Sequence, residues 1–155
     1  MKTDQFKNKV ILVTSDTGSI GRKLVIRLLR QNPKLVKIFI RDKHTYWLLE
    51  KGLEEQFPRQ TFMHVIGDVR DENRLSLVYK NVDIMFHTAG LKHVPYAEQN
   101  LEESFEINIH GACSVIRAAA KNEVEKVIVI SPDKAGPAVF NDRYYKTPYR
   151  EVVHI

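Results

Sequence analysis

The stretch Val10-Ile-Leu-Val-Thr-Ser-Asp-Thr-Gly-Ser-Ile-Gly21 decides the fold. Its first part, residues 10–14, is a short unbroken apolar run, which is typical of a buried strand. In the residues that follow, the apolar side chains are spaced as on one face of a helix, at Ile20, Leu24, Val25, Leu28 and Leu29. A buried strand that turns directly into a helix is the first unit of an α/β protein.

The same unit repeats along the chain. Further strands are expected at residues 36–40, 62–66, 82–87 and 127–130, and helices at residues 46–57, 72–79 and 101–121. Connections this short favour right-handed crossovers and a parallel sheet with helices on both faces. The pattern predicts a Rossmann-type doubly wound sheet with the strand order 3-2-1-4-5.

The alternation ends after strand five. We therefore expect residues 1–135 to form one dinucleotide-binding domain and residues 136–155 to form a divergent tail. A short strand expected at residues 150–155 would cover the open edge of strand five, either by folding back or by pairing with a second chain, and the sequence favours the second chain. The sequence thus favours a homo-oligomer.

Composition narrows the function classes. The 155 residues are 43% hydrophobic and 28% charged, as in a globular protein, and no apolar run approaches the ~20 residues of a membrane span. The net charge of +5 comes from scattered residues, so we expect no nucleic-acid partner. His87 and His93 have no partner at ligand spacing, which argues against a metal site. The polar N-terminus lacks signal-peptide features and predicts a cytoplasmic protein.

The turn after the first strand is the expected cofactor loop. Ligands of this fold bind beyond the carboxyl ends of the strands, where glycines let backbone amides approach a pyrophosphate. Gly18 and Gly21 suit this role, although both could serve helix packing alone. Ser15 and Asp16 stand where a glycine loop would be open, and we expect them to weaken binding. The cofactor contacts expected in this loop are Thr14, Thr17, Gly18, Ser19, Ile20 and Gly21.

The ends of the next strands complete the expected cofactor site. Arg41, Asp42 and Lys43 follow the second strand, where a carboxylate would hold a ribose hydroxyl and a cation a 2′-phosphate. Two cations favour NADP and leave NAD possible, whereas a solvated strand end is the alternative. Asp68 and Val69 close the third strand, and small residues close the fourth, namely Thr88, Ala89 and Gly90.

Several segments carry a resemblance to a known family. They are Gly67-Asp-Val-Arg-Asp71, Ala89-Gly-Leu-Lys-His-Val-Pro95, Glu98, Asn108-Ile-His-Gly111 and Ser131-Pro-Asp-Lys-Ala135. Over its first 135 residues or so the chain resembles the extended short-chain dehydrogenases of the polysaccharide-biosynthesis type, the UDP-N-acetylglucosamine 4,6-dehydratases.

The resemblance implies a hydride relay on a UDP-sugar, in which hydride leaves sugar C4, water is lost across C5 and C6, and hydride returns to C6. It implies that Asp133 protonates the departing hydroxyl and that Lys134 removes the C5 proton, while a surface ion pair is the alternative. Asn108 would support the cofactor and the active site. The residues implied for the substrate are Lys92, His93, Val94 and Glu98.

The chain also departs from the family pattern. The family's Tyr-x-x-x-Lys pair falls on Asp142 and Lys146, and full enzymes of this kind are about twice as long. These departures favour a truncated relative that is inactive alone and leave enzymatic activity undecided. The alternative is a non-catalytic nucleotide-binding or assembly module on the same fold. The helices of family members tend to assemble, which the resemblance implies for this chain as well.

Overall fold

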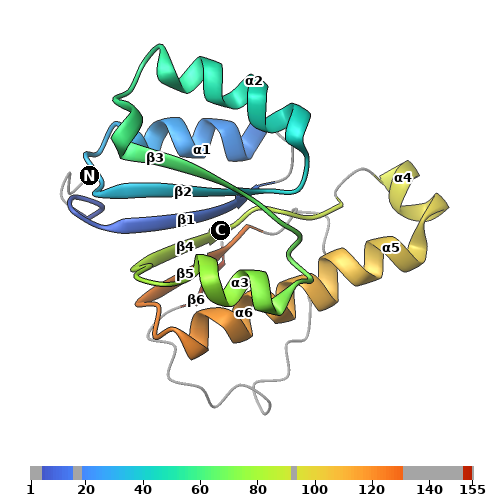
Figure 1. Cartoon of the computed structure of the whole chain (residues 1–155). Helices are drawn as coiled ribbons and strands as arrows, with labels where there is room; N and C mark the ends of the chain where they lie inside the picture. The colour runs from blue at the N-terminus through green and yellow to red at the C-terminus, as the bar shows by residue number, and fades with distance from the viewer. Residues whose placement is uncertain (1–4, 16–18, 92–93, 131–151, 155) are drawn as a thin grey trace.

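The computed structural model describes residues 5–15, 19–91, 94–130 and 152–154. Its strands form one parallel sheet in the order β3-β2-β1-β4-β5-β6 (Figure 1). The strands are β1 (Val10–Ser15), β2 (Leu35–Ile40), β3 (Phe62–Ile66), β4 (Ile84–His87), β5 (Lys126–Val129) and β6 (Val152–His154). The order predicted for the first five strands is confirmed.

Helices cover both faces of the sheet. In Figure 1, α1 (Ser19–Leu29) and α2 (Lys43–Glu54) lie on one face, and α3 (Glu72–Val78) and α6 (Ala112–Lys121) lie on the other. The remaining helical segments are η1 (Arg59–Thr61), α4 (Val94–Gln99), α5 (Leu101–Phe105) and the π-helical turn η2 (Glu106–Gly111). The segment α4–α5 projects beyond the sheet (Figure 1).

The central strand β1 is buried on both faces. Ile11 and Val13 pack with Val25 of α1 in one hydrophobic cluster, whereas Leu12 packs with Val115 of α6 in the other. All five side chains are fully buried. Because successive strand residues point to opposite faces, a strand covered on both sides is apolar in a continuous run, here residues 10–13 of β1. This packing explains the unbroken apolar run that opens the fold.

The long helix expected at residues 101–121 has a different form. Helical structure starts earlier, at α4, and the α5–α6 segment is interrupted by the π turn η2. The turn ends at Gly111, which packs against the loop that follows β3. An added Cβ at Gly111 would lie 2.7 Å from Cγ2 of Val69. A π turn shifts the helix by one residue without breaking it, so the apolar period alone does not reveal it. The second helix also lies earlier than expected, at Lys43–Glu54 rather than residues 46–57.

The tail strand folds back within its own chain. β6 pairs in parallel with β5, with Ile128 opposite Val153, which is the fold-back alternative for the tail and not the favoured pairing with a second chain. A parallel crossover needs about a dozen residues or more, and residues 130–151 supply that length between the two strands. The edge of β5 is therefore covered by intramolecular pairing.

Candidate active site

The carboxyl ends of β1 and β4 are joined by buried polar contacts. Thr14 Oγ1 and His87 Nδ1 lie 2.6 Å apart and share a hydrogen bond between residues in register. The Thr14 carbonyl accepts hydrogen bonds from Thr88 Oγ1 at 2.8 Å and from the Thr88 backbone nitrogen at 2.9 Å. Thr14 and Thr88 are buried, so these two predicted cofactor residues tie the two strands together.

A pocket opens beside this tie, at the carboxyl ends of the strands. It has a volume of about 360 Å³ including its open mouth. We call it the edge pocket, and its lining comprises Ser15, Phe39, Arg41, Gly67, Asp68, Val69, Ala89, Gly90 and Ile107. The structure thus brings together five residues that the sequence predicted for the cofactor: Arg41, Asp68, Val69, Ala89 and Gly90.

The sequence reasoning missed several lining residues. Phe39 and Ile107 lie within expected elements, but nothing in their spacing distinguishes a pocket wall from the core. Ser15 was expected to oppose a ligand, and it does line the pocket. Gly67 was visible in the family motif and serves close packing, because an added Cβ would lie 2.5 Å from Cε2 and Cζ of Phe39.

The glycine turn packs tightly against the strand. An added Cβ at Gly21 would lie 3.0 Å from Cβ of Ser15 and 3.2 Å from Oγ1 of Thr88. Gly21 therefore allows α1 to approach β1 closely. A glycine that serves only helix packing would do this, and so would a glycine of a phosphate-binding turn. Ser19 and Ile20 are exposed at the start of α1. Thr17 and Gly18 lie outside the described residues.

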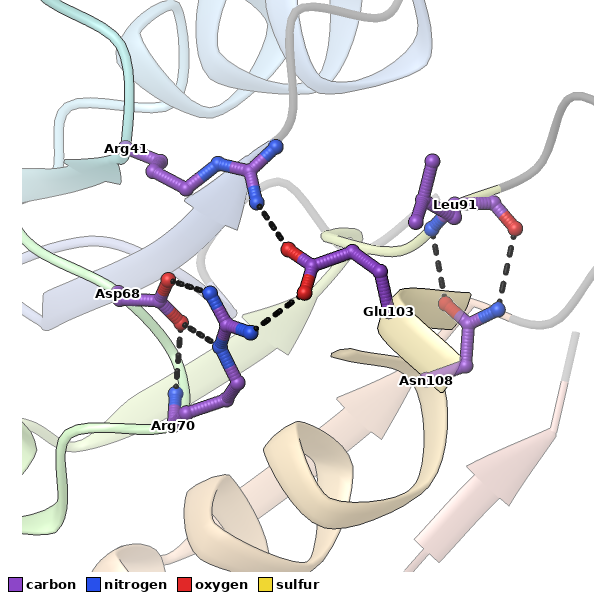
Figure 2. A network of polar contacts seen from close by, with 6 residues as sticks. All are labelled: Arg41, Asp68, Arg70, Leu91, Glu103 and Asn108. Carbon is purple, nitrogen blue, oxygen red and sulfur yellow. Dashed lines mark hydrogen bonds and ion pairs between the residues drawn. The ribbon is translucent and has the colours of Figure 1, made fainter. Parts of the chain in front are cut away.

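Four charged side chains form a network at the rim of the edge pocket (Figure 2). Asp68 accepts three hydrogen bonds from Arg70, from the backbone nitrogen at 3.0 Å, from Nε at 2.9 Å and from Nη2 at 2.6 Å. Arg70 Nη1 also donates to Glu103 Oε2 at 2.9 Å, and Arg41 Nη1 lies 3.5 Å from Glu103 Oε1. The hydrogen bonds from Arg70 lower the pKa of the Asp68 carboxyl. Asp68 thus stays ionised at neutral pH and gives the pocket a fixed acceptor.

Asn108 supports the loop that leaves β4. Its Oδ1 accepts from the Leu91 backbone nitrogen at 2.8 Å, and its Nδ2 donates to the Leu91 carbonyl at 3.1 Å (Figure 2). Nδ2 also lies 3.2 Å from Ser104 Oγ. Two hydrogen bonds to one backbone residue fix the path of this loop. Asn108, expected at the cofactor, is placed here as a positioning residue.

The other predicted site residues lie apart from the pocket lining or outside the described chain. Asp42 and Lys43 are exposed, and Glu98 is exposed on α4, which begins at Val94. The residues outside the described ranges are Lys92, His93, Asp133 and Lys134. In the ranges that the structure describes, no cluster of three or more His, Cys, Asp or Glu could hold a metal ion. None of the described helices is long and apolar enough to cross a membrane.

Known proteins share this fold and much of this sequence. The family model for polysaccharide biosynthesis protein matches residues 11–140. UDP-N-acetylglucosamine 4,6-dehydratase (inverting) of Campylobacter jejuni is 42% identical over 130 residues, which are 84% of this chain and 38% of that enzyme. The chain therefore spans about 38% of the length of this curated relative.

Solved structures agree with the sequence comparison. Pen from Bacillus thuringiensis superimposes with a TM-score of 0.77 at 34% identity, covering 81% of this chain and 39% of that one. UDP-glucose 4-epimerase from Bifidobacterium longum, solved in complex with NAD⁺ and UDP, gives 0.68 at 25% identity and covers 80% and 37%. By its family match, its relatives and its sheet, the chain belongs to the polysaccharide biosynthesis protein family, alongside nucleotide-sugar dehydratases and epimerases.

Proposed function

We propose that this chain is the NADP-binding part of a nucleotide-sugar 4,6-dehydratase of the UDP-N-acetylglucosamine type. The observation that carries the proposal is the edge pocket, which gathers Arg41, Asp68, Val69, Ala89 and Gly90 from the segments that follow three strands of the sheet, β2, β3 and β4. Pockets at the carboxyl ends of parallel strands, beside the switch point between β1 and β4, are the ligand sites of this fold. We also place the protein in the cytoplasm, in keeping with its single cysteine.

The residues of the pocket suit a dinucleotide. The ionised Asp68 offers an acceptor for hydroxyl or amino groups of the adenosine, and Arg41 offers a cation for a 2′-phosphate. Ala89 and Gly90 have little or no side chain, so a ligand can approach the backbone closely. When bound, the nicotinamide accepts and returns hydride, while these residues hold and orient the cofactor.

Titration of the purified chain by calorimetry tests the proposal. We expect NADP to bind about five- to tenfold more tightly than NAD, because Arg41 adds a charge-assisted contact at a half-exposed position. Arg41→Ala should bring the two affinities together and leave NAD binding unchanged. Equal affinities in the unaltered chain would contradict the preference for NADP, and binding of neither dinucleotide would overturn the proposed function.

We further propose that the 155 residues bind cofactor without completing the dehydration. The position that the family fills with the active-site tyrosine is occupied here by Asp142, whose carboxylate is a poor match for a phenol that takes a hydroxyl proton. Incubation with UDP-N-acetylglucosamine and NADP should give no 4-keto-6-deoxy sugar by mass spectrometry. Product that disappears in Asp133→Asn would show the opposite.

The chain is also proposed to form a homo-oligomer, through helices rather than through its tail. Leu101, Phe105 and Ile109 recur every fourth residue along α5 and η2 and are 71%, 51% and 46% exposed. Leu101 and Phe105 share one face of α5, and together with Ile109 of η2 we call them the stripe, which a second copy would cover.

Sedimentation velocity tests this interface. The unaltered chain should sediment as a dimer, and Phe105→Asp should sediment as a monomer because a charge would be buried in the stripe. Leu77→Asp is the matched control, since Leu77 is 58% exposed on α3 and should not affect the dimer. A monomeric unaltered chain would refute the proposal.

A further inference from the structure

We propose that Glu103 is a specificity-determining residue, a tethered anion that competes with the 2′-phosphate of NADP for Arg41. The inference rests on the proposed function, since it concerns the same pocket. It assigns a role to a helix residue that no strand-end pattern identifies, 62 positions after Arg41 along the chain.

The two oxygens of Glu103 are divided between two arginines (Figure 2). Oε2 accepts from Arg70 Nη1 at 2.9 Å, which is a well-formed hydrogen bond, whereas Oε1 lies 3.5 Å from Arg41 Nη1. Arg70 is itself fixed by its paired hydrogen bonds to Asp68. The carboxylate of Glu103 is therefore held in place by Arg70 and faces Arg41 through its second oxygen.

The contact of Glu103 with Arg41 is the weaker of the two, and Arg41 is the arginine that lines the edge pocket. The Arg41 side chain is 52% exposed and lines the edge pocket, so an anion from solvent can reach its guanidinium. The network of Arg41, Arg70, Asp68 and Glu103 joins two cationic and two anionic side chains, so its net charge is already zero. A phosphate that binds Arg41 must share it with Glu103 or displace it.

This arrangement penalises NADP and leaves NAD unaffected. A phosphate beside Arg41 comes close to the Glu103 carboxylate, and like charges at such a distance repel each other even when partly screened. NAD has an uncharged hydroxyl at that position and meets no such repulsion. Glu103 thus reduces the preference for NADP that Arg41 provides.

A charge-neutral substitution tests the inference. Glu103→Gln keeps the length of the side chain and an oxygen for Arg70 while it removes the negative charge. In calorimetric titrations we expect its affinity for NADP to rise about three- to tenfold and its affinity for NAD to change less than about twofold. Glu103→Ala, which removes both contacts, should change the affinities in the same direction.

Two controls define the mechanism. Glu102→Gln removes the same charge from the neighbouring exposed position on α5 and should leave both affinities unchanged. In the Arg41→Ala background, Glu103→Gln should no longer raise NADP affinity, because the competition is for Arg41. Thermal unfolding of each variant verifies that the fold is intact.

The outcomes separate this inference from the proposed function. An unchanged or reduced NADP affinity in Glu103→Gln, while the unaltered chain binds dinucleotide, overturns the inference alone. A gain that persists without Arg41 also overturns it, because Glu103 would then act on the ligand by another route. Binding of neither dinucleotide to the unaltered chain overturns both.

Discussion

Replacing Ala89 with leucine should weaken NADP binding at least about a hundredfold while the protein stays folded. Ala89 follows β4 and is half-buried in the lining of the edge pocket. Leucine adds three carbons to this wall, and a ligand could bind only by displacing them. A hundredfold loss corresponds to about 2.7 kcal/mol, which is within the range that overfilling a packed site costs.

Ala97→Leu provides the matched control for this experiment. Ala97 is half-buried as well, but it belongs to α4 and does not line the edge pocket. Calorimetric titration should show ordinary NADP affinity in Ala97→Leu and greatly weakened affinity in Ala89→Leu, with similar thermal unfolding of both. Ordinary affinity in Ala89→Leu would mean that the dinucleotide binds elsewhere.

The sheet could be predicted from the sequence because its signals are local. Each buried parallel strand needs a continuous apolar run, and each helix needs one apolar face, so the alternation and the order of the first five strands follow from short stretches. The pairing of β6 within the chain does not follow in this way. It depends on whether residues 130–151 can cross back over the sheet, and no local period encodes that.

The residues that line the edge pocket were predicted in part, and the difference has a physical cause. Arg41, Asp68 and Ala89 were found because strand ends of this fold converge on one edge. Thr14 and Thr88 lie at strand ends too, but the Thr14 hydroxyl pairs with His87 Nδ1 and the Thr88 hydroxyl donates to the Thr14 carbonyl across the buried junction of β1 and β4. A strand-end position indicates proximity to the site, whereas hydrogen-bond partners decide whether a side chain remains available to a ligand.

The contacts of Glu103 and Asn108 could not be predicted from the sequence. Glu103 lies on α5 and Asn108 lies within the π turn η2 that follows it. Asn108 reaches the backbone of Leu91, and Glu103 reaches two arginines from other parts of the chain. These contacts depend on tertiary packing, so they become visible only in the assembled fold.

Gly67→Ala should lower the free energy of unfolding by about 2 kcal/mol, the second large effect expected. The added methyl would lie 2.5 Å from two ring carbons of Phe39, whose side chain is only 1% exposed and cannot move aside freely. In a protein of this length such a loss should lower the unfolding temperature by about 6 °C in differential scanning calorimetry.

Two further variants establish that the loss from Gly67→Ala comes from the Phe39 ring. Phe39→Leu removes the part of the ring that the methyl meets, so Gly67→Ala should cost much less in that background, and the double-mutant cycle measures the coupling. Gly52→Ala is the control, because Gly52 lies within α2 and its added methyl would meet only the tip of Arg22 at 3.2 Å. Alanine is the better helix former, so Gly52→Ala should leave stability unchanged or raise it by up to about 1 kcal/mol. An equal cost of Gly67→Ala with and without the Phe39 ring would show that another neighbour requires glycine there, such as Cγ of Arg74, which would lie 2.9 Å from the added methyl.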